Sequence, residues 1–148
     1  MKKFLFHTTN DASETLLRVA LGLVMFPHGA QKMLGWFGGY GWSGTMGYFE
    51  GQMHVPAIFA ALAICAEFFG SLGLITGLFT RVAAFGILAN MVVAVAMVHA
   101  KIGFFMNWFG AQQGEGFEYH ILVIAMALVV IWKGSGAWSA DRLIAAEA

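Results

Sequence analysis

Four long apolar stretches alternate along the chain with connections that are polar or aromatic. The stretches cover about residues 15–35, 55–78, 82–100 and 117–132. Each approaches the ~20 residues that a helix needs to cross ~30 Å of hydrocarbon. The pattern predicts an all-α fold, a four-transmembrane-helix bundle, that occupies residues 1–148 as a single domain.

Two long connections, 36–54 and 101–116, join these stretches, and both are rich in glycine and aromatic residues. Because Trp and Tyr favour the interface between membrane and water, we expect residues 36–54 to form a cap or half-helix that lies there. The remaining connection is a tight turn at 79–81. The two long connections therefore share one side of the bundle.

The distribution of cationic residues sets the orientation of such a bundle. Six of them lie on the side of the termini, at Lys2, Lys3, Arg18, Arg81, Lys133 and Arg142, and two lie on the other side, at Lys32 and Lys101. Cytoplasmic segments carry the excess of Lys and Arg. We therefore expect cytoplasmic termini and outer-side long connections, with Arg18, Arg81, Lys101 and Lys133 as anchors that snorkel to the headgroups.

Composition supports the membrane class and excludes others. Only 11% of the residues are charged and 59% are hydrophobic, whereas a soluble domain carries about 25% charged residues. The formal net charge of zero leaves no electrostatic footprint for nucleic acid. The single cysteine, Cys65, excludes an internal disulfide and a multi-cysteine metal site.

Several ionisable side chains interrupt the apolar stretches. His28 and Lys32 lie one turn apart on the same face of the first helix, with Gln31 about 60° away. Glu67 lies 12 residues into the second stretch, which is ~18 Å along a helix, and its nearest expected partners are Lys32 and His28. Because such groups are costly inside a membrane, they are functional candidates. We predict His28 and Glu67 to be the catalytic groups.

Further polar residues lie near the outer ends of the last two stretches. The candidate cofactor-binding set is therefore His28, Gln31, Lys32, Trp36, His99, Glu118 and His120. Three chemistries fit it. A quinone would accept hydrogen bonds from His and Lys, with Glu or His relaying protons and aromatic side chains lining the ring. A metal or haem would need His28, His99 and His120, no two of which share a helix. A transport pathway would use Glu67 as a proton-linked gate.

Several segments of the sequence carry a family resemblance. They are Leu17-Arg-Val19 with Gly22, Pro27-His-Gly-Ala-Gln-Lys32, the stretch from Ala66-Glu67 to Thr80-Arg81, Val98-His99 with Gly103-Phe104, and Ser139-Ala-Asp-Arg-Leu143. On these residues the chain resembles the DoxX family of small four-helix bacterial membrane proteins and, more distantly, the DoxD subunit of thiosulfate:quinone oxidoreductase. The resemblance implies a subunit linked to quinone, thiol or sulfur redox chemistry and to oxidative-stress defence.

The sequence thus leads to one expected function and one alternative. We expect a quinone-binding component of an oxidoreductase system in the bacterial inner membrane, with a soluble redox enzyme or a second copy of the chain as candidate partners. Cys65 alone cannot perform dithiol–disulfide exchange within one chain, which disfavours an independent thiol oxidoreductase. The alternative is a non-catalytic membrane scaffold or a small-solute transporter.

Overall fold

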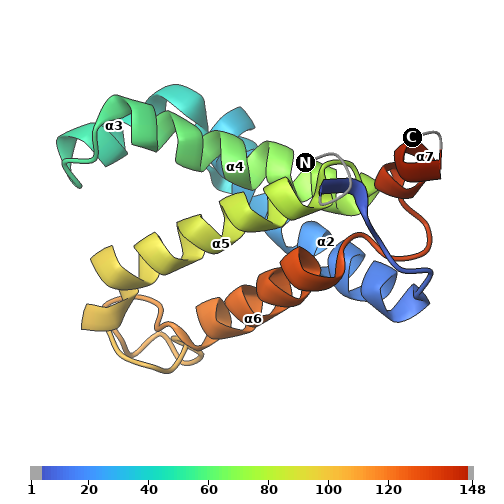
Figure 1. The fold of residues 1–148 in the computed structure, drawn as a ribbon. Coiled ribbons are helices and arrows are strands. Elements are labelled where there is room, and N and C mark those ends of the chain that lie inside the picture. The colour runs from blue at the N-terminus through green and yellow to red at the C-terminus, as the bar shows by residue number, and fades with distance from the viewer. Residues whose placement is uncertain (1–4, 147–148) are drawn as a thin grey trace.

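The computed structural model describes residues 5–146, and every regular element within them is a helix (Figure 1). The four long helices are α2 (Ala12–Leu34), α4 (Ala57–Thr76), α5 (Thr80–Met97) and α6 (Glu118–Lys133). The short elements are η1 (Trp36–Gly38), α3 (Gly41–Gly51), η2 (His99–Lys101) and α7 (Ala140–Ala146). The all-α prediction is confirmed, and the long helices coincide with the four predicted stretches.

Two of the long helices are long and apolar enough to cross a membrane. Among the described residues these are α4 and α5. Helix α6 has 16 residues, and α2 carries Glu14, Arg18 and Lys32. Passage of all four helices through the bilayer therefore stays a prediction.

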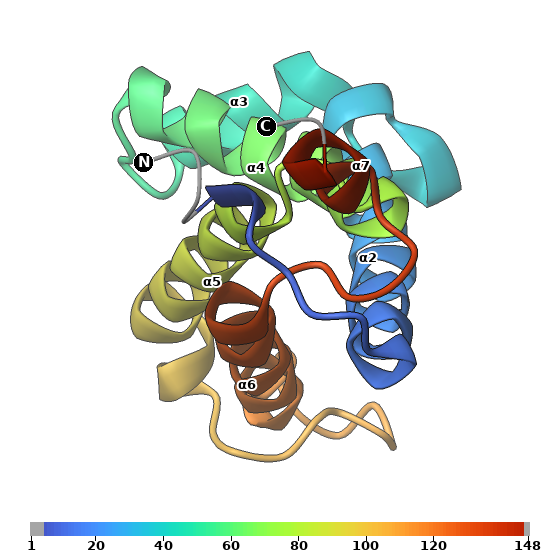
Figure 2. The same cartoon turned by 45° about the vertical axis from the view of Figure 1, so that its right-hand side comes forward.

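The long helices pack in chain order around a shared apolar core. Helix α4 packs on both α2 and α5, and α6 packs mainly on α5 (Figure 2). The buried core residues are Leu21, Met25, Leu74, Ala84, Ile87, Met91, Val123, Ala127 and Val130. Many other large apolar side chains of these helices point outward and are exposed. This arrangement suits a bundle whose outer surface meets lipid rather than water.

Glycines in α2 allow it to approach α4 closely. A Cβ at Gly29 would lie 2.7 Å from the backbone nitrogen of Phe68, and one at Gly22 would lie 2.9 Å from the carbonyl oxygen of Ser71. Small residues let two membrane helices bring their backbones together. The contact at Gly29 also positions the last turn of α2 beside Glu67 of α4.

The two ends of the bundle differ in their elements. The first described residues and α7 lie at one end, called here the terminal end, while α3 and η2 lie at the opposite end, called the connection end (Figures 1 and 2). The expected grouping of the two long connections at one end is thereby confirmed. The expected cap or half-helix in residues 36–54 is the helix α3.

Arg18 is a structural residue at the terminal end and not the snorkelling anchor that the sequence predicted. The side chain is buried, with 1% of the residue exposed. Its guanidinium donates hydrogen bonds to the carbonyls of Leu74 and Ile75 in the last turn of α4. It also donates to the carbonyls of Ser135, at 2.8 Å, and Trp138, at 2.6 Å. One side chain thus ties α2 to the end of α4 and to the segment before α7.

Two further charged residues complete this end of the fold. The carboxylate of Asp141 is buried and accepts hydrogen bonds from the backbone nitrogens of Phe79, at 2.7 Å, and Thr80, at 2.9 Å. It therefore caps the start of α5. Arg81 is also buried and donates to the carbonyl of Trp132 at 3.2 Å, so the snorkelling prediction is wrong for this residue as well.

Candidate functional site

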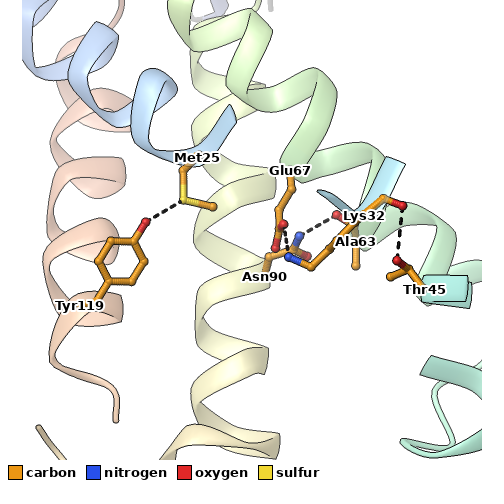
Figure 3. Close-up of polar contacts among 7 residues, drawn as sticks. All are labelled: Met25, Lys32, Thr45, Ala63, Glu67, Asn90 and Tyr119. Carbon is orange, nitrogen blue, oxygen red and sulfur yellow. Dashed lines mark hydrogen bonds and ion pairs between the residues drawn. The ribbon is translucent and has the colours of Figure 1, made fainter. Parts of the chain in front are cut away.

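An ion pair between α2 and α4 lies toward the connection end of the bundle. The Nζ atom of Lys32 is 2.5 Å from Oε2 of Glu67 (Figure 3). The Glu67 side chain is 7% exposed and that of Lys32 is 30% exposed. The expected partnership of these two residues is confirmed. Because a buried carboxylate is costly without a partner, the pair explains how Glu67 can be held inside the bundle.

The local structure favours this pair. Lys32 lies in the last turn of α2, where the helix dipole stabilises a cation. Asn90 of α5 lies next to Glu67 and donates a hydrogen bond to the carbonyl of Ala63 at 2.7 Å (Figure 3). Three helices therefore meet near the carboxylate.

His28 and Tyr119 form an aromatic pair between α2 and α6. Their ring centroids are 6.1 Å apart, and the Tyr119 hydroxyl donates to Sδ of Met25 at 3.5 Å (Figure 3). His28 is exposed in the protein alone. Sequence reasoning missed Tyr119, although a tyrosine directly before His120 in an apolar helix was a usable signal.

His99 and His120 lie together although they come from different elements. Their ring centroids are 4.0 Å apart, and Nδ1 of His99 is 2.8 Å from the carbonyl oxygen of Glu115. His120 is 7% exposed, and its buried Nδ1 has no hydrogen-bond partner among the described residues. The structure thus brings two predicted site residues together and leaves one buried ring nitrogen without a hydrogen-bond partner among the described residues.

The other predicted site residues have different surroundings. Oε1 of Glu118 accepts hydrogen bonds from the backbone nitrogen of Met106, at 3.0 Å, and from Nε1 of Trp108, at 3.1 Å. This carboxylate therefore holds the connection between η2 and α6 in place. Trp36 is exposed on η1, and Gln31 donates to the carbonyl of Phe37 at 3.2 Å.

A pocket of about 270 Å³ is lined in part by Lys32, and we call it the Lys32 pocket. It is lined by Gln31, Lys32, Gly38, Gly39, Tyr40, Thr45, Tyr48 and Phe49. Gln31 and Lys32 come from the last turn of α2, and three aromatic residues come from α3 and the residue before it. Such a pocket can donate hydrogen bonds to a polar head while contacting a flat ring.

Metal binding was one of the three chemistries that the sequence left open. Across residues 5–146 no three His, Cys, Asp or Glu side chains come together as a metal-binding group. His28, His99 and His120 therefore do not form a three-histidine site in this arrangement.

Comparisons with known proteins agree with the resemblance seen in the sequence. The DoxX family profile matches residues 14–100. The chain is 27% identical over 150 aligned positions to an uncharacterized membrane protein of Mycobacterium tuberculosis (strain ATCC 25618 / H37Rv), Rv3486, covering 97% of this chain and 88% of that relative. No solved structure matches the chain. The matched residues include both partners of the Lys32–Glu67 pair, and the chain belongs to the DoxX family of membrane proteins.

Proposed function

We propose that the protein is a quinone-binding membrane component of an oxidoreductase system and that the quinone head occupies the Lys32 pocket. The observation that carries this proposal is the position of Lys32. Its ammonium group is ion-paired with Glu67, and the residue is also one of those that line a pocket with aromatic walls.

The chemistry of the pocket suits a quinone head. Lys32 Nζ would donate a hydrogen bond to one quinone carbonyl, and the side chains of Tyr40 and Tyr48 offer further donors. Phe49 and the tyrosine rings would contact the flat faces of the head. Glu67 would hold the ammonium group in place through their ion pair.

The groups around Glu67 are suited to proton exchange with such a ligand. Reduction of a quinone to a quinol takes up two protons with two electrons. Glu67 and His28 are the titratable groups on the inner side of Lys32, and imidazole changes its protonation near neutral pH. A soluble redox enzyme is the proposed source or acceptor of the electrons.

We also propose that α2, α4, α5 and α6 all cross the bacterial inner membrane, with both termini in the cytoplasm. The Lys and Arg asymmetry supports this orientation, and large apolar side chains are exposed on all four helices. In a Cys65→Ala background, a cysteine at Ser43 or Gln113 should react with an impermeant thiol reagent from outside. A cysteine at Ala145 should not react, and the opposite pattern would overturn the orientation.

Quinone content tests the proposed function directly. The parent and the variants Lys32→Gln, Glu67→Gln and His28→Gln are purified in parallel in lipid nanodiscs, and bound quinone is extracted and measured per protein. The parent should carry quinone, and each variant should lose most of it. Lys133→Gln is the matched control, because Lys133 is an exposed lysine at the terminal end.

Two outcomes would contradict the quinone proposal. One is equal quinone in all samples, and the other is no quinone in the parent. Copurification of a soluble enzyme with a quinone-free parent would favour the scaffold alternative.

A further inference from the structure

A second and larger pocket lies between α3 and the end of α5, and we call it the η2 pocket. Its volume is about 570 Å³. It is lined by Tyr48, Gln52, Met53, Ala96, Met97, Val98, Lys101 and Ile102. Helix α3 packs on α2 and α4, so the η2 pocket lies along another side of α3. Tyr48 lines this pocket and the Lys32 pocket as well.

The lining of the η2 pocket is amphipathic and carries positive charge without a negative partner. Lys101 is exposed and forms no ion pair with any residue in the described range 5–146. No acidic side chain lines the pocket. This differs from Lys32, whose charge is balanced by Glu67 at 2.5 Å. The pocket therefore favours a ligand with an anionic group.

The remaining lining residues define the rest of such a ligand. The side chains of Gln52 and Tyr48 can donate hydrogen bonds to an anionic oxygen. Met53, Met97 and Ile102 present apolar surface on the same pocket, and methionine adapts readily to flexible chains. An anionic head joined to hydrocarbon matches both parts of the lining.

The position of Lys101 in the fold restricts the class of ligand further. Lys101 ends η2, directly after α5, and α5 is one of the two helices apolar enough to span a membrane. A cationic side chain at the end of a membrane helix reaches the level of the lipid headgroups. At that level the most abundant amphiphiles with a negative charge are anionic phospholipids.

We propose that the η2 pocket binds an anionic phospholipid, with its phosphate at Lys101 and the start of its acyl chains along Met53, Met97 and Ile102. The lipid would join α3 to the end of α5 and η2. This site rests on Lys101 and the η2 pocket, so it does not depend on quinone binding at Lys32.

Lipid retention tests the proposal. The full-length protein is purified in a non-ionic detergent, mixed with phosphatidylglycerol or phosphatidylcholine, and examined by native mass spectrometry. The parent should retain phosphatidylglycerol in preference to phosphatidylcholine. Lys101→Gln should bind phosphatidylglycerol at least about fivefold more weakly, since one basic residue at the membrane surface contributes about 1 kcal/mol. Lys133→Gln, which changes an exposed lysine at the terminal end, should bind like the parent.

A second variant tests the pocket independently of its charge. Ala96→Trp places a bulky side chain on the pocket wall and should also reduce retention of phosphatidylglycerol. Ala125→Trp is the control, because Ala125 is an exposed residue of α6 outside the pocket, and it should not reduce retention. Equal retention of phosphatidylglycerol by the parent and Lys101→Gln would overturn the proposal. Equal retention of the two lipids by the parent would also overturn it. So would displacement of phosphatidylglycerol by an equal concentration of inorganic phosphate, because the site would then recognise a free anion.

Discussion

The two ends of the bundle use charged side chains in opposite ways. At the terminal end, Arg18 and Asp141 are buried and their hydrogen bonds go to backbone groups of other elements. At the connection end, Lys32 is partly exposed at a pocket, and Nδ1 of His120 has no partner within residues 5–146. The first set fixes the fold, whereas the second holds a partly exposed side chain at a pocket and a buried nitrogen that no described residue satisfies.

This difference shows that a charge inside a membrane protein is not by itself a functional signal. Among the cationic residues in the range 5–146, Arg18 is the most buried, and its hydrogen bonds all go to carbonyl groups. Lys32 has one ion-pair partner, and 30% of its side chain is exposed. What separates the two roles is whether the polar atoms are all satisfied within the fold.

The largest expected effect is at Arg18. Arg18→Leu would leave four carbonyl groups of α4 and the α7 region without their donor, so we expect a loss of more than about 3 kcal/mol in the free energy of unfolding. Thermal unfolding in detergent measures this loss. Lys32→Gln should change the melting temperature much less. An equal effect of both substitutions would contradict the assignment of a structural role to Arg18 and a binding role to Lys32.

The next effect concerns the contact that positions the ion pair. Gly29→Ala would place a methyl group 2.7 Å from the Phe68 backbone, so α2 and α4 must separate at a cost of about 1–3 kcal/mol. The variant should therefore lose both stability and quinone. Gly47→Ala is the matched control, because a Cβ there meets no atom within 4 Å. Unchanged quinone content in Gly29→Ala would show that the helix contact and the pocket are independent.

A smaller effect is expected at the start of α5. Asp141→Ala removes the acceptor for the backbone nitrogens of Phe79 and Thr80, and loss of a helix cap costs about 0.5–2 kcal/mol. The same unfolding measurement checks this value, and quinone content should remain that of the parent. A loss of quinone without a loss of stability would contradict a purely structural role for the terminal end.

The smallest effect concerns the start of α2. The pKa of Asp11 lies below its ordinary value of 3.8, because the backbone nitrogen and hydroxyl of Ser13 donate hydrogen bonds to its carboxylate. The ionised Asp11 carboxylate therefore stabilises the folded protein fully at pH values above its ordinary pKa. This contribution is lost as the pH falls through the lower pKa that Asp11 has in the folded protein. Asp11→Ala should lower the melting temperature slightly at pH ~7, and the difference should shrink as the pH falls below the ordinary value of the Asp11 pKa. A difference that is independent of pH would exclude this cap as its cause.

The helices could be predicted from the sequence because apolar length fixes where helices form in a membrane protein. The Lys32–Glu67 pair followed from depth along two helices. The roles of Arg18 and Arg81 could not be predicted, because their partners are backbone carbonyls, which any sequence provides. His99 and His120 could not be paired either, since their contact depends on the change from α5 to the tighter turn of η2. The unpartnered nitrogen of His120 is visible only once the packing is known.

The hydrogen bonds of Arg18 also determine the order in which the protein can be completed. Arg18 lies in the first of the four long helices, whereas two of its acceptors, Ser135 and Trp138, follow the last of them. Until the segment after α6 is synthesised, the guanidinium lacks half of its carbonyl partners. A variant truncated after residue 134 would therefore leave this cation incompletely bound.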